Sequence, residues 1–487
     1  MTAKADFHKK PNTREVCQRM ADVYIVYARE DHSVAEKLYG LLTSRWDTWW
    51  DDKIAGRYAK AIENEMPKAR CVVPLFSAAS RAKDTFTEEL KLGQKYNAEI
   101  LPVRLDRSDP PYPFGVYSYT ELQDWNGETD HPGILQLQRR IATIVPPKEK
   151  ARQPVAILSG RIPLPTLFLS VSSHETQLIP AEAVQALRVF GAPTILASAY
   201  DTVARRNPQE MISALAEYRE AGGFVLLDSG NYEASRLGTR RWKVRDLEEA
   251  LSNTPHDCAF CFDDLKPPRD PELAVEAIVQ AVTRDQSLTD APILPIVHAP
   301  VSKRGSGYIL DHLPAIVREI ANRLHPQLIA VPERELGPGL IARAKTMLAI
   351  REELNTLPFY QPIHLLGTGN PWSIAILAAA GADTFDGLEW CRVVVDGATD
   401  RLHHFQHFDF FTYQTAMADS SVAREALRDP KIDFAGKVAF HNLDYFANFV
   451  QSMRDATKGG SIEAFVVGLV GKDTANQLRK QIPDIFK

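Results

Sequence analysis

Short apolar runs alternate with amphipathic stretches over the second half of this chain. The runs that have the length of buried strands are TLFLSVS (166–172), PTILASA (193–199), GFVLLD (223–228), CAFCFD (258–263), ILPIVH (293–298), QLIAV (327–331), PIHLLG (362–367) and ADTFD (382–386). Eight strand-and-helix repeats over roughly 250 residues predict a (β/α)8 barrel between about 155 and 411, with a helical tail behind it.

Polar residues or a glycine follow six of these runs at or just after their ends. The residues are Asp228, Asp263, His298, Glu333, Gly367 and Asp386. The carboxyl ends of the strands in a parallel barrel meet at the face that carries the active site, so this pattern predicts one enzyme site. For any single aspartate the alternative is a cap on the following helix.

A smaller α/β unit precedes the barrel. The runs VYIVYA (23–28), CVVPLF (71–76) and EILPVRL (99–105) have the composition of buried parallel strands, and they predict a doubly wound sheet within residues 21–145. The proline-rich and charged stretch at 146–154 is typical of a linker. We therefore expect an α/β unit at 21–145, a linker, and a barrel with C-terminal helices at 155–487.

Composition narrows the classes of protein that fit. A chain of 487 residues that is 45% hydrophobic and 24% charged is typical of a soluble globular protein, and its net charge of -5 excludes a general polyanion binder. Five cysteines do not make a disulfide framework at this length. The N-terminus lacks an apolar signal core and no run is long enough to span a bilayer, so we expect a cytoplasmic protein without membrane contact.

The first unit contains four ordered segments of one known family. They are DVYIVYAREDHSVAEKLYGLL (22–42), WDTWWDDKIAGR (46–57), CVVPLFSAASRAKDTFTEELKLG (71–93) and YPFGVYSYTELQDWNG (112–127). Together they resemble a bacterial TIR (Toll/interleukin-1 receptor) domain. The resemblance implies a flavodoxin-like fold, cleavage of the nicotinamide glycosidic bond of NAD, assembly into a homo-oligomer and a role in antiphage defence. It also implies that Glu89 is catalytic, although Thr85 stands where the family's W-x-x-E-L pattern usually has tryptophan.

A glutamate suits this chemistry. Cleavage at C1′ of the ribose develops oxocarbenium character, which a nearby carboxylate stabilises. Glu88 and Glu89 point about 100° apart on a helix, so only one of them can face a cleft. The alternative for such a pair is two solvated surface acids.

Five further residues are expected to bind NAD: Tyr27, Ala28, Arg29, Trp50 and Asp51. The first three end the first strand, where ligands bind in open α/β sheets, and Arg29 suits the diphosphate. The other two begin the loop toward a glycine at position 56. A core aromatic and ordinary loop polar groups are the alternative for these positions.

Seven segments of the second part match another family in order. They are FVLLDSGNYE (224–233), CFDDLKPP (261–268), LPIVHAPV (294–301), IAVPERELG (329–337), LLGTGNP (365–371), GADTFDGLEWCR (381–392) and FHNLDYFANFVQSMRDATKGGSIEAF (440–465). They resemble the queuine tRNA-ribosyltransferase (tRNA-guanine transglycosylase) family. The resemblance implies that Asp228 is a general acid/base, that Asp386 is the nucleophile at C1′ of a nucleotide, and that Asp263 recognises the base edge. His298, Glu333 and Gly367 are expected to complete the substrate site.

These roles also make chemical sense without the family. A carboxylate nucleophile can hold a covalent ribosyl intermediate while a second acid protonates the departing base. A third carboxylate can accept hydrogen bonds from the N1–H and exocyclic amine of a guanine-like ring. We therefore expect a guanine-like base, nucleotide or nucleic acid as the ligand of the barrel.

The chain departs from the family pattern at several positions. His298 stands where a glutamine usually reads the base, Asn231 follows D-S-G, and Glu-Trp-Cys at 389–391 replaces L-P-T. The histidine of the family's zinc site is present as His441, but no cysteine follows Cys391, so we predict no zinc. Sensing or an altered substrate is therefore favoured over queuine exchange in tRNA.

Three other motifs have a purely structural interpretation and a functional one. Cys258 and Cys261 are expected to pack in the core rather than bind metal. The histidines at 403, 404 and 407 are expected to line the pocket as a loop rather than bind metal. The stretch 235–246, with five basic residues and Trp242, is either a nucleic-acid patch near the barrel mouth or a solvated loop.

The leading hypothesis is a TIR NAD+ hydrolase effector coupled to a barrel that senses or processes a guanine-like base or nucleic acid. The alternative is a base-modifying transglycosylase whose TIR unit serves only for interaction. A third interpretation makes both units inactive scaffolds.

Overall fold

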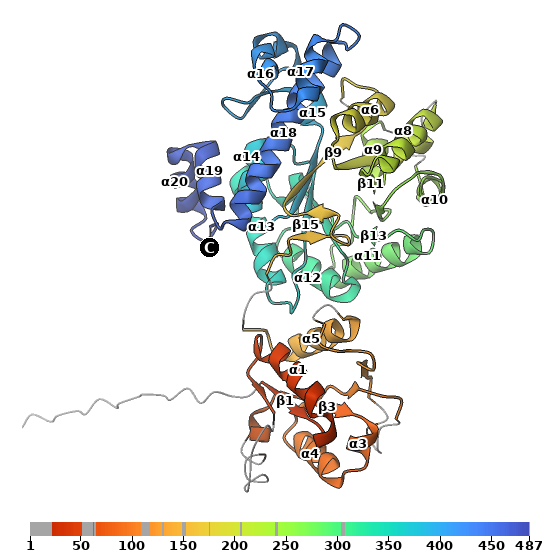
Figure 1. Ribbon diagram of the computed structural model, residues 1–487, viewed down its shortest axis with the longest axis vertical. Helices are drawn as coiled ribbons and strands as arrows, with labels where there is room; N and C mark the ends of the chain where they lie inside the picture. The colour runs from red at the N-terminus through yellow and green to blue at the C-terminus, as the bar shows by residue number, and fades with distance from the viewer. Residues whose placement is uncertain are drawn as a thin grey trace, which may run out of the picture. The chain divides into compact units, whose positions relative to one another are not determined.

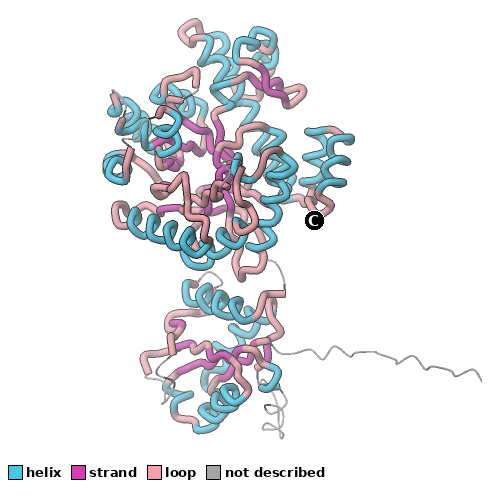
Figure 2. The backbone as a smooth tube through the Cα atoms, turned by 180° about the vertical axis from the view of Figure 1, so that it is seen from behind, coloured by secondary structure: helices cyan, strands magenta, loops and turns pink. Residues whose placement is uncertain are grey.

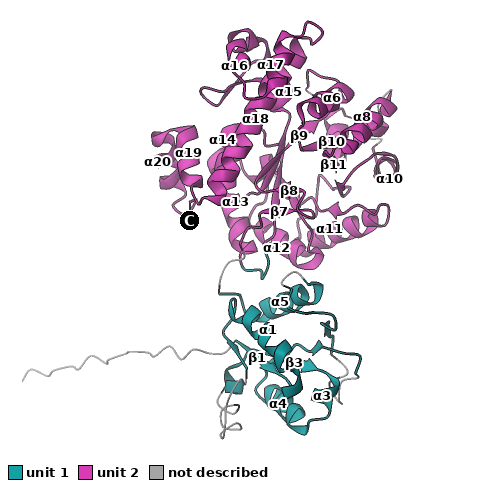
Figure 3. Cartoon of the chain, in the orientation of Figure 1, with its two compact units in different colours: residues 1–150, 356–359 teal, residues 151–355, 360–487 magenta. Residues whose placement is uncertain are grey.

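The computed structural model describes residues 22–50, 62, 65–108, 114, 117–128, 131–148, 152–174, 176–204, 207–238, 242–302 and 307–486. The chain divides into two compact units, one of residues 1–150 with 356–359 and one of residues 151–355 with 360–487 (Figures 1 and 3). Both units are α/β, as predicted.

A parallel sheet forms the centre of the first unit. Its strands are β1 (Val23–Val26), β2 (Thr48–Trp49), β3 (Cys71–Phe76), β4 (Glu99–Ile100), β5 (Val103–Arg104) and β6 (Thr120–Glu121). They lie in the order β2-β1-β3-β5-β6, with β4 also paired to β3, which is the flavodoxin-like order expected. The predicted strand at 99–105 is divided at Pro102, which has no N–H to donate to the ladder.

Helices α1 (His32–Thr43), α3 (Ala78–Arg81), α4 (Asp84–Lys95) and α5 (Pro132–Ile144) cover this sheet. Helix α4 turns Phe86, Leu90 and Gly93 toward the core at helical spacing. A Cβ at Gly93 would lie 3.1 Å from Val72 Cγ2, so the small residue lets the helix lie close to β3. This packing fixes α4, and with it the helix face that carries the candidate Glu89.

Eight parallel strands form the barrel of the second unit. They are β9 (Thr166–Val171), β10 (Thr194–Ser198), β11 (Phe224–Asp228), β12 (Cys258–Phe260), β13 (Ile293–Leu294), β14 (Ile329–Pro332), β15 (Ile363–Leu366) and β16 (Thr384–Gly387), and every one falls on a predicted run. The sheet runs from β13 at one edge to β14 at the other. Beyond β13, Val297 N donates to Ala330 O at 2.8 Å and Ala330 N donates to Pro295 O at 2.9 Å. These bonds nearly close the barrel, which confirms the predicted (β/α)8 class.

Helices surround the strands in both views of the backbone (Figures 1 and 2). They are α6 (Pro180–Phe190), α7 (Ala199–Val203), α8 (Pro208–Glu220), α9 (Asn231–Arg236), α10 (Val244–Asn253), α11 (Pro271–Gln286), α12 (Leu313–Leu324), α13 (Leu340–Leu354) and α14 (Pro371–Ala379). Four of them begin with proline, whose fixed φ favours the first helical position. Among all described helices, none is both long and apolar enough to cross a membrane.

A hairpin closes the amino-terminal end of the barrel. Strands β7 (Ala156–Ile157) and β8 (Ile162–Pro163) pack their apolar residues against Phe224 and Cys258, which begin β11 and β12. Cys258 therefore belongs to the core, as predicted, and it forms no disulfide. With this end filled, the opposite end of the barrel is the one available for a site.

The chain after β16 forms α15 (Glu389–Arg392), β17 (Val394–Asp396), β18 (Arg401–His403), η5 (Phe405–Phe410), α16 (Thr412–Ala416), α17 (Ser421–Arg428), α18 (Phe434–Lys458), α19 (Ile462–Val470) and α20 (Lys472–Gln481). On α18, His441 Nε2 lies 2.7 Å from Val395 O, and Asn442 Oδ1 accepts a bond of 3.0 Å from Val395 N. The other ring nitrogen of His441 lies 2.9 Å from Thr415 Oγ1. Both nitrogens of His441 are thus engaged within the protein, one by β17 and the other by α16, and the residues present do not fit the zinc site that the family resemblance implies.

Candidate functional site

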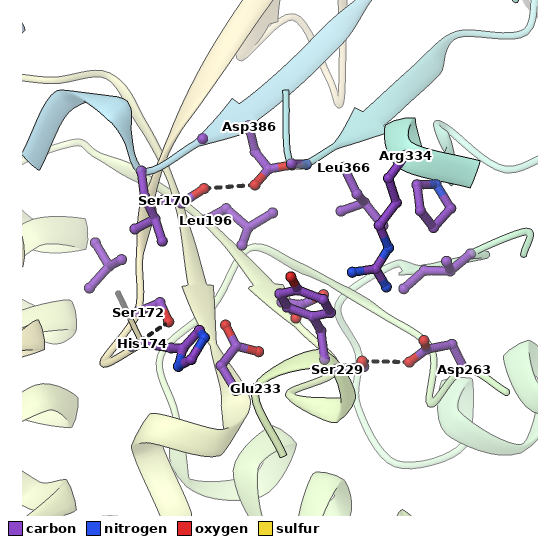
Figure 4. A pocket seen from close by; sticks show the side chains of 18 of the residues that line it. Ser170, Ser172, His174, Leu196, Ser229, Glu233, Asp263, Arg334, Leu366 and Asp386 are labelled. Atoms are coloured by element: carbon purple, nitrogen blue, oxygen red, sulfur yellow. Dashed lines mark hydrogen bonds between the residues drawn. The ribbon is translucent and has the colours of Figure 1, made fainter. Parts of the chain in front are cut away.

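A cavity of about 220 Å³ lies at the carboxyl-terminal end of the barrel strands (Figure 4). Its wall includes five of the six predicted strand-end residues, namely Asp228, Asp263, His298, Gly367 and Asp386. Parallel strands bring these residues together although they are separated by up to 158 positions in the sequence, from 228 to 386. Glu333, the sixth, does not line the cavity.

Asp386, on β16, is held in one orientation by several donors. Its Oδ2 accepts a bond of 2.7 Å from Ser170 Oγ, and its Oδ1 accepts one of 2.7 Å from Gly367 N (Figure 4). His364 Nε2 lies 3.2 Å from the same Oδ1, and its Nδ1 lies 2.9 Å from Thr384 Oγ1. The backbone and the barrel interior therefore position this carboxylate before any ligand binds.

Asp228 ends β11 and has a different environment. Burial raises its pKa well above the usual value, and the nearby charges of Glu233, Asp263 and Asp386 raise it further. The N–H of Gly230, at 3.4 Å, is a weak compensating donor. The protonated form of Asp228 is therefore favoured relative to an exposed aspartate, which suits a proton donor.

Asp263 is part of a buried charge chain. Its Oδ1 accepts a bond of 2.6 Å from Ser229 Oγ, and its Oδ2 lies 2.8 Å from His298 Nε2. The other ring nitrogen of His298 lies 3.0 Å from Glu335 Oε1. Burial acts against the charged imidazole, but the two carboxylates outweigh it and raise the pKa of His298 to about 10. Burial likewise acts to raise the pKa of Asp263, and His298 lowers it below the usual value.

The two carboxylates limit the contacts that His298 can make with a ligand. We expected it to contact the substrate, in the position where a glutamine reads the base. It lines the cavity, but both of its nitrogens bind carboxylates of the protein. Its evident structural effect is to keep Asp263 ionised in a buried place.

The expected role of Glu333 needs correction. This residue begins the 3-10 helix η4 (Glu333–Leu336), and Arg343 Nη1 binds its two carboxylate oxygens at 2.7 and 2.6 Å. Glu335 is the residue of this turn that supports the site, since it contacts His298 and accepts a bond of 2.9 Å from Ala299 N. A turn with two glutamates two positions apart gave no sequence signal to choose between them.

Glu233, on α9, was not singled out from the sequence. It lines the cavity and is only 7% exposed, and its Oε2 has no hydrogen-bond partner among the described residues (Figure 4). Burial and then the nearby charge of Asp201 raise its pKa to about 7. The signal that was available is its place in the first turn of the helix that follows Gly230.

The unusual Glu-Trp-Cys segment forms another part of the wall. Arg392 Nη2 donates to Glu389 Oε1 at 2.6 Å, and burial raises the pKa of Glu389. A Cβ at Gly369 would lie 1.6 Å from Glu389 Oε2, so a larger residue there would displace this carboxylate. Trp390 Nε1 donates to Ser170 O at 2.9 Å and so supports the strand that carries a partner of Asp386.

The residues expected to bind NAD lie at the carboxyl edge of the first sheet. Tyr27 is half-buried, Ala28 is buried and Arg29 is exposed. The ring of Trp50 lies 5.6 Å from that of Tyr27 and is also close to those of His32 and Tyr39. Trp50 thus belongs to an aromatic cluster, while Asp51 and the loop to position 56 lie outside the described residues.

The same edge carries hydrogen-bonded acidic groups. Ser77 Oγ donates to Asp31 Oδ2 at 2.6 Å, and Ala78 N donates to Asp106 Oδ2 at 2.7 Å. Burial raises the pKa of Asp31, and Asp106 adds to this effect. On α4, Glu89 is partly buried and Glu88 is exposed, so the two differ as helical geometry requires.

Trp242 and the histidines at 403, 404 and 407 do not lie where the sequence predicted. Trp242 is buried, and its Nε1 donates to Ser229 O at 3.0 Å, so it supports the wall of the cavity rather than presenting a stacking surface. The three histidines at 403, 404 and 407 lie in β18, η5 and the residue between them, and do not line the cavity, so that prediction was wrong. Within the described ranges, no group of three or more His, Cys, Asp or Glu residues is arranged to hold a metal ion.

Comparison with known proteins agrees with the family resemblance of each part of the chain. Residues 23–137 match the TIR domain family. Similar proteins include the tRNA-guanine(15) transglycosylases of Archaeoglobus fulgidus (21% identical, covering 62% of this chain and 62% of the relative), Pyrococcus furiosus (23%, 62% and 51%) and Methanopyrus kandleri (22%, 62% and 65%). The chain thus spans between about half and two thirds of these relatives' length. A TIR domain is therefore followed in this chain by an eight-stranded parallel barrel similar to tRNA-guanine transglycosylases.

Proposed function

We propose that this protein is a TIR NAD+ hydrolase effector coupled to a barrel that binds a guanine-like base or nucleotide, with a role in antiphage defence. The observation that carries the proposal is the convergence of Asp228, Asp263 and Asp386 on one cavity. The match of residues 23–137 to the TIR domain family supports the effector half.

The state of Asp263 favours a ligand with adjacent N–H groups. Each of its oxygens already accepts one internal bond, from Ser229 or from the imidazolium of His298. An ionised carboxylate has about four acceptor sites, so each oxygen can take one more donor. The N1–H and exocyclic amine of a guanine-like ring present such a pair, and Asp228 in its protonated form can donate a hydrogen bond to an acceptor of the same ring.

A second candidate function is pentosyl transfer, because the two aspartates have different environments. Asp386 accepts hydrogen bonds from Ser170 and Gly367, whereas burial raises the pKa of Asp228. An oxygen of Asp386 would attack C1′ of the nucleoside while the C1′–N bond breaks and its electron pair moves onto the base. Asp228 would deliver its proton to the base. An incoming base or water would then displace Asp386 and return a proton to Asp228, which restores both groups.

In the effector half, Glu89 is proposed to stabilise the oxocarbenium character at the ribose of NAD. Its partial burial on α4 is compatible with a contact to substrate, whereas Glu88 is exposed. Homo-oligomers formed through TIR units are proposed as the active form. A barrel ligand can control this assembly only if it binds the assembled and separate states with different affinity.

The test of the barrel proposal is a calorimetric titration of the full-length chain with guanine. We expect binding by the wild type and a loss of about tenfold or more for Asp263→Asn, because one charged acceptor is removed. Glu248→Gln is a matched control on the exposed face of α10. Absence of guanine binding, or equal binding by wild type and Asp263→Asn, would refute the base-binding role.

A further inference from the structure

The cavity has opposite polarity at its floor and its mouth. Asp228, Asp263 and Asp386 are buried at the strand ends. Arg334 also lines the cavity but is an exposed side chain. A ligand that uses both parts needs hydrogen-bond donors at one end and negative charge at the other.

The turn that carries Arg334 is fixed on both sides. Glu333 is held by Arg343, and Glu335 is held by His298 and by the N–H of Ala299. The side chain between these two anchors is directed into the space between Asp386 and Asp263 (Figure 4). Its direction therefore follows from the fold of η4.

Arg334 also contacts an aromatic ring. Its Cζ lies 4.5 Å from the centroid of Tyr232, which is 38% exposed and lines the same cavity. Arg236 Cζ lies 5.9 Å from the same ring. Guanidinium groups stack on aromatic faces while their N–H groups remain available at the edges.

The arginines around the cavity differ in their ion pairs. Arg392 binds Glu389 and Arg343 binds Glu333, whereas Arg334 forms no ion pair with any described residue. An arginine beside several carboxylates but paired with none is suited to an anion from outside. Phosphate and carboxylate are the anions that its planar fork binds best.

We infer that Arg334, supported by Tyr232, recognises the phosphate of a purine nucleoside phosphate that enters the cavity base first. This inference rests on the proposed base-binding function and names its substrate class. With base and sugar facing the three aspartates, the 5′ substituent is left at the mouth, where Arg334 lies. Both a free mononucleotide and a nucleotide within a strand carry this chemistry.

Calorimetric titrations of the full-length protein with guanine, guanosine, guanosine 5′-monophosphate and a short single-stranded guanosine-containing RNA test the inference. In the wild type we expect the monophosphate to bind about tenfold or more tightly than guanosine. Arg334→Ala should remove this advantage and leave the affinities for guanine and guanosine unchanged. Arg334→Lys should keep part of it, because the charge remains without the bidentate fork.

Arg245→Ala is the matched control, since this arginine is also exposed and does not line the cavity. Thermal unfolding of each variant establishes that it is folded. Equal affinity of the wild type for guanosine and both phosphate-bearing ligands would overturn the phosphate inference, while guanine binding would still uphold the base site. A loss of guanine affinity in Arg334→Ala would also overturn it, because the residue would then shape the base site itself.

The RNA arm separates the two sources. An advantage dependent on Arg334 for RNA over the monophosphate supports a strand, and the reverse preference supports a free nucleotide. Failure of all four ligands to bind would overturn the proposed function, and this inference with it.

Discussion

The two candidate carboxylate sites of this chain differ in how far each unit completes its own site. In the barrel, Asp228, Asp263 and Asp386 are 7–8% exposed, and they share one cavity with fixed partners. In the TIR unit, Glu89 lies on a helix and is only partly buried. Burial lets a fold set the protonation of a carboxylate by itself, whereas a more exposed group acquires its environment from substrate or a neighbouring chain.

We therefore expect the barrel site to bind its ligand in a single chain, and the TIR site to depend on assembly of several chains. Within the barrel, the pKa values of Asp228 and Asp263 are shifted in opposite directions. Desolvation raises the pKa of Asp228, while the imidazolium of His298 keeps that of Asp263 low. The following variants test these contrasts, from the largest expected effect to the smallest.

The TIR side of the comparison depends on Glu89. Glu89→Gln should reduce NAD cleavage by at least 100-fold with folding intact, since it removes a charge and preserves side-chain volume. NAD turnover measured in the assembled protein gives the result. Glu88→Gln is the control and should be nearly silent, so equal effects of the two variants would exclude the assignment.

The barrel side depends on Asp386. If the barrel catalyses pentosyl transfer, Asp386→Ala should eliminate a covalent adduct with nucleic acid and slow base exchange by at least 100-fold. Intact-mass analysis and exchange of labelled guanine measure these outcomes. If the barrel only senses, the wild type should show neither reaction, and guanine binding and NAD cleavage should change little in the variant. Rapid incorporation of guanine into ordinary tRNA by the wild type would contradict the preference for sensing.

The buried charge chain gives a stability prediction. His298→Gln leaves Asp263 and Glu335 as buried carboxylates without their cation, which should cost about 3–5 kcal/mol of unfolding free energy at pH 7. The folded pKa of His298 is about 10, above its usual 6.5, so its contribution to stability is complete below pH 6.5 and is lost as pH rises through 10. Denaturant unfolding at pH 6, 8 and 10 checks this window. A variant as stable as wild type at pH 6 would contradict the charge chain.

Glu233 should also lower the stability as pH rises, but in a lower pH range than His298. Its folded pKa is about 7 against a usual value of 4.5, so ionising it in the folded state costs stability as pH rises from 4.5 through 7. Glu233→Gln should therefore match wild type at pH 4.5 and exceed its unfolding free energy at pH 8 by up to about 3 kcal/mol. A gain that is the same at both pH values would place its origin outside this titration.

The sequence predicted the barrel well because its strands are buried on both sides and read as continuous apolar runs. The ends of five runs then located the wall of the cavity, as with Asp228 and Asp386. What it missed are residues that depend on side-chain direction within a turn. Periodicity does not show that Glu335 rather than Glu333 faces inward, or that Trp242 is buried beneath Ser229. The family resemblance suggested a base contact for His298, but the two carboxylates that bind it come from different loops.

The most direct test of the account is the rate of NAD consumption by the full-length protein with and without guanosine 5′-monophosphate, in wild type and in Asp263→Asn. The account predicts that the nucleotide changes the wild-type rate by about tenfold or more, and that Asp263→Asn cleaves NAD at the unliganded rate whether or not nucleotide is present. A wild-type rate that the nucleotide leaves unchanged although it is bound in the barrel would contradict the coupling of the two units.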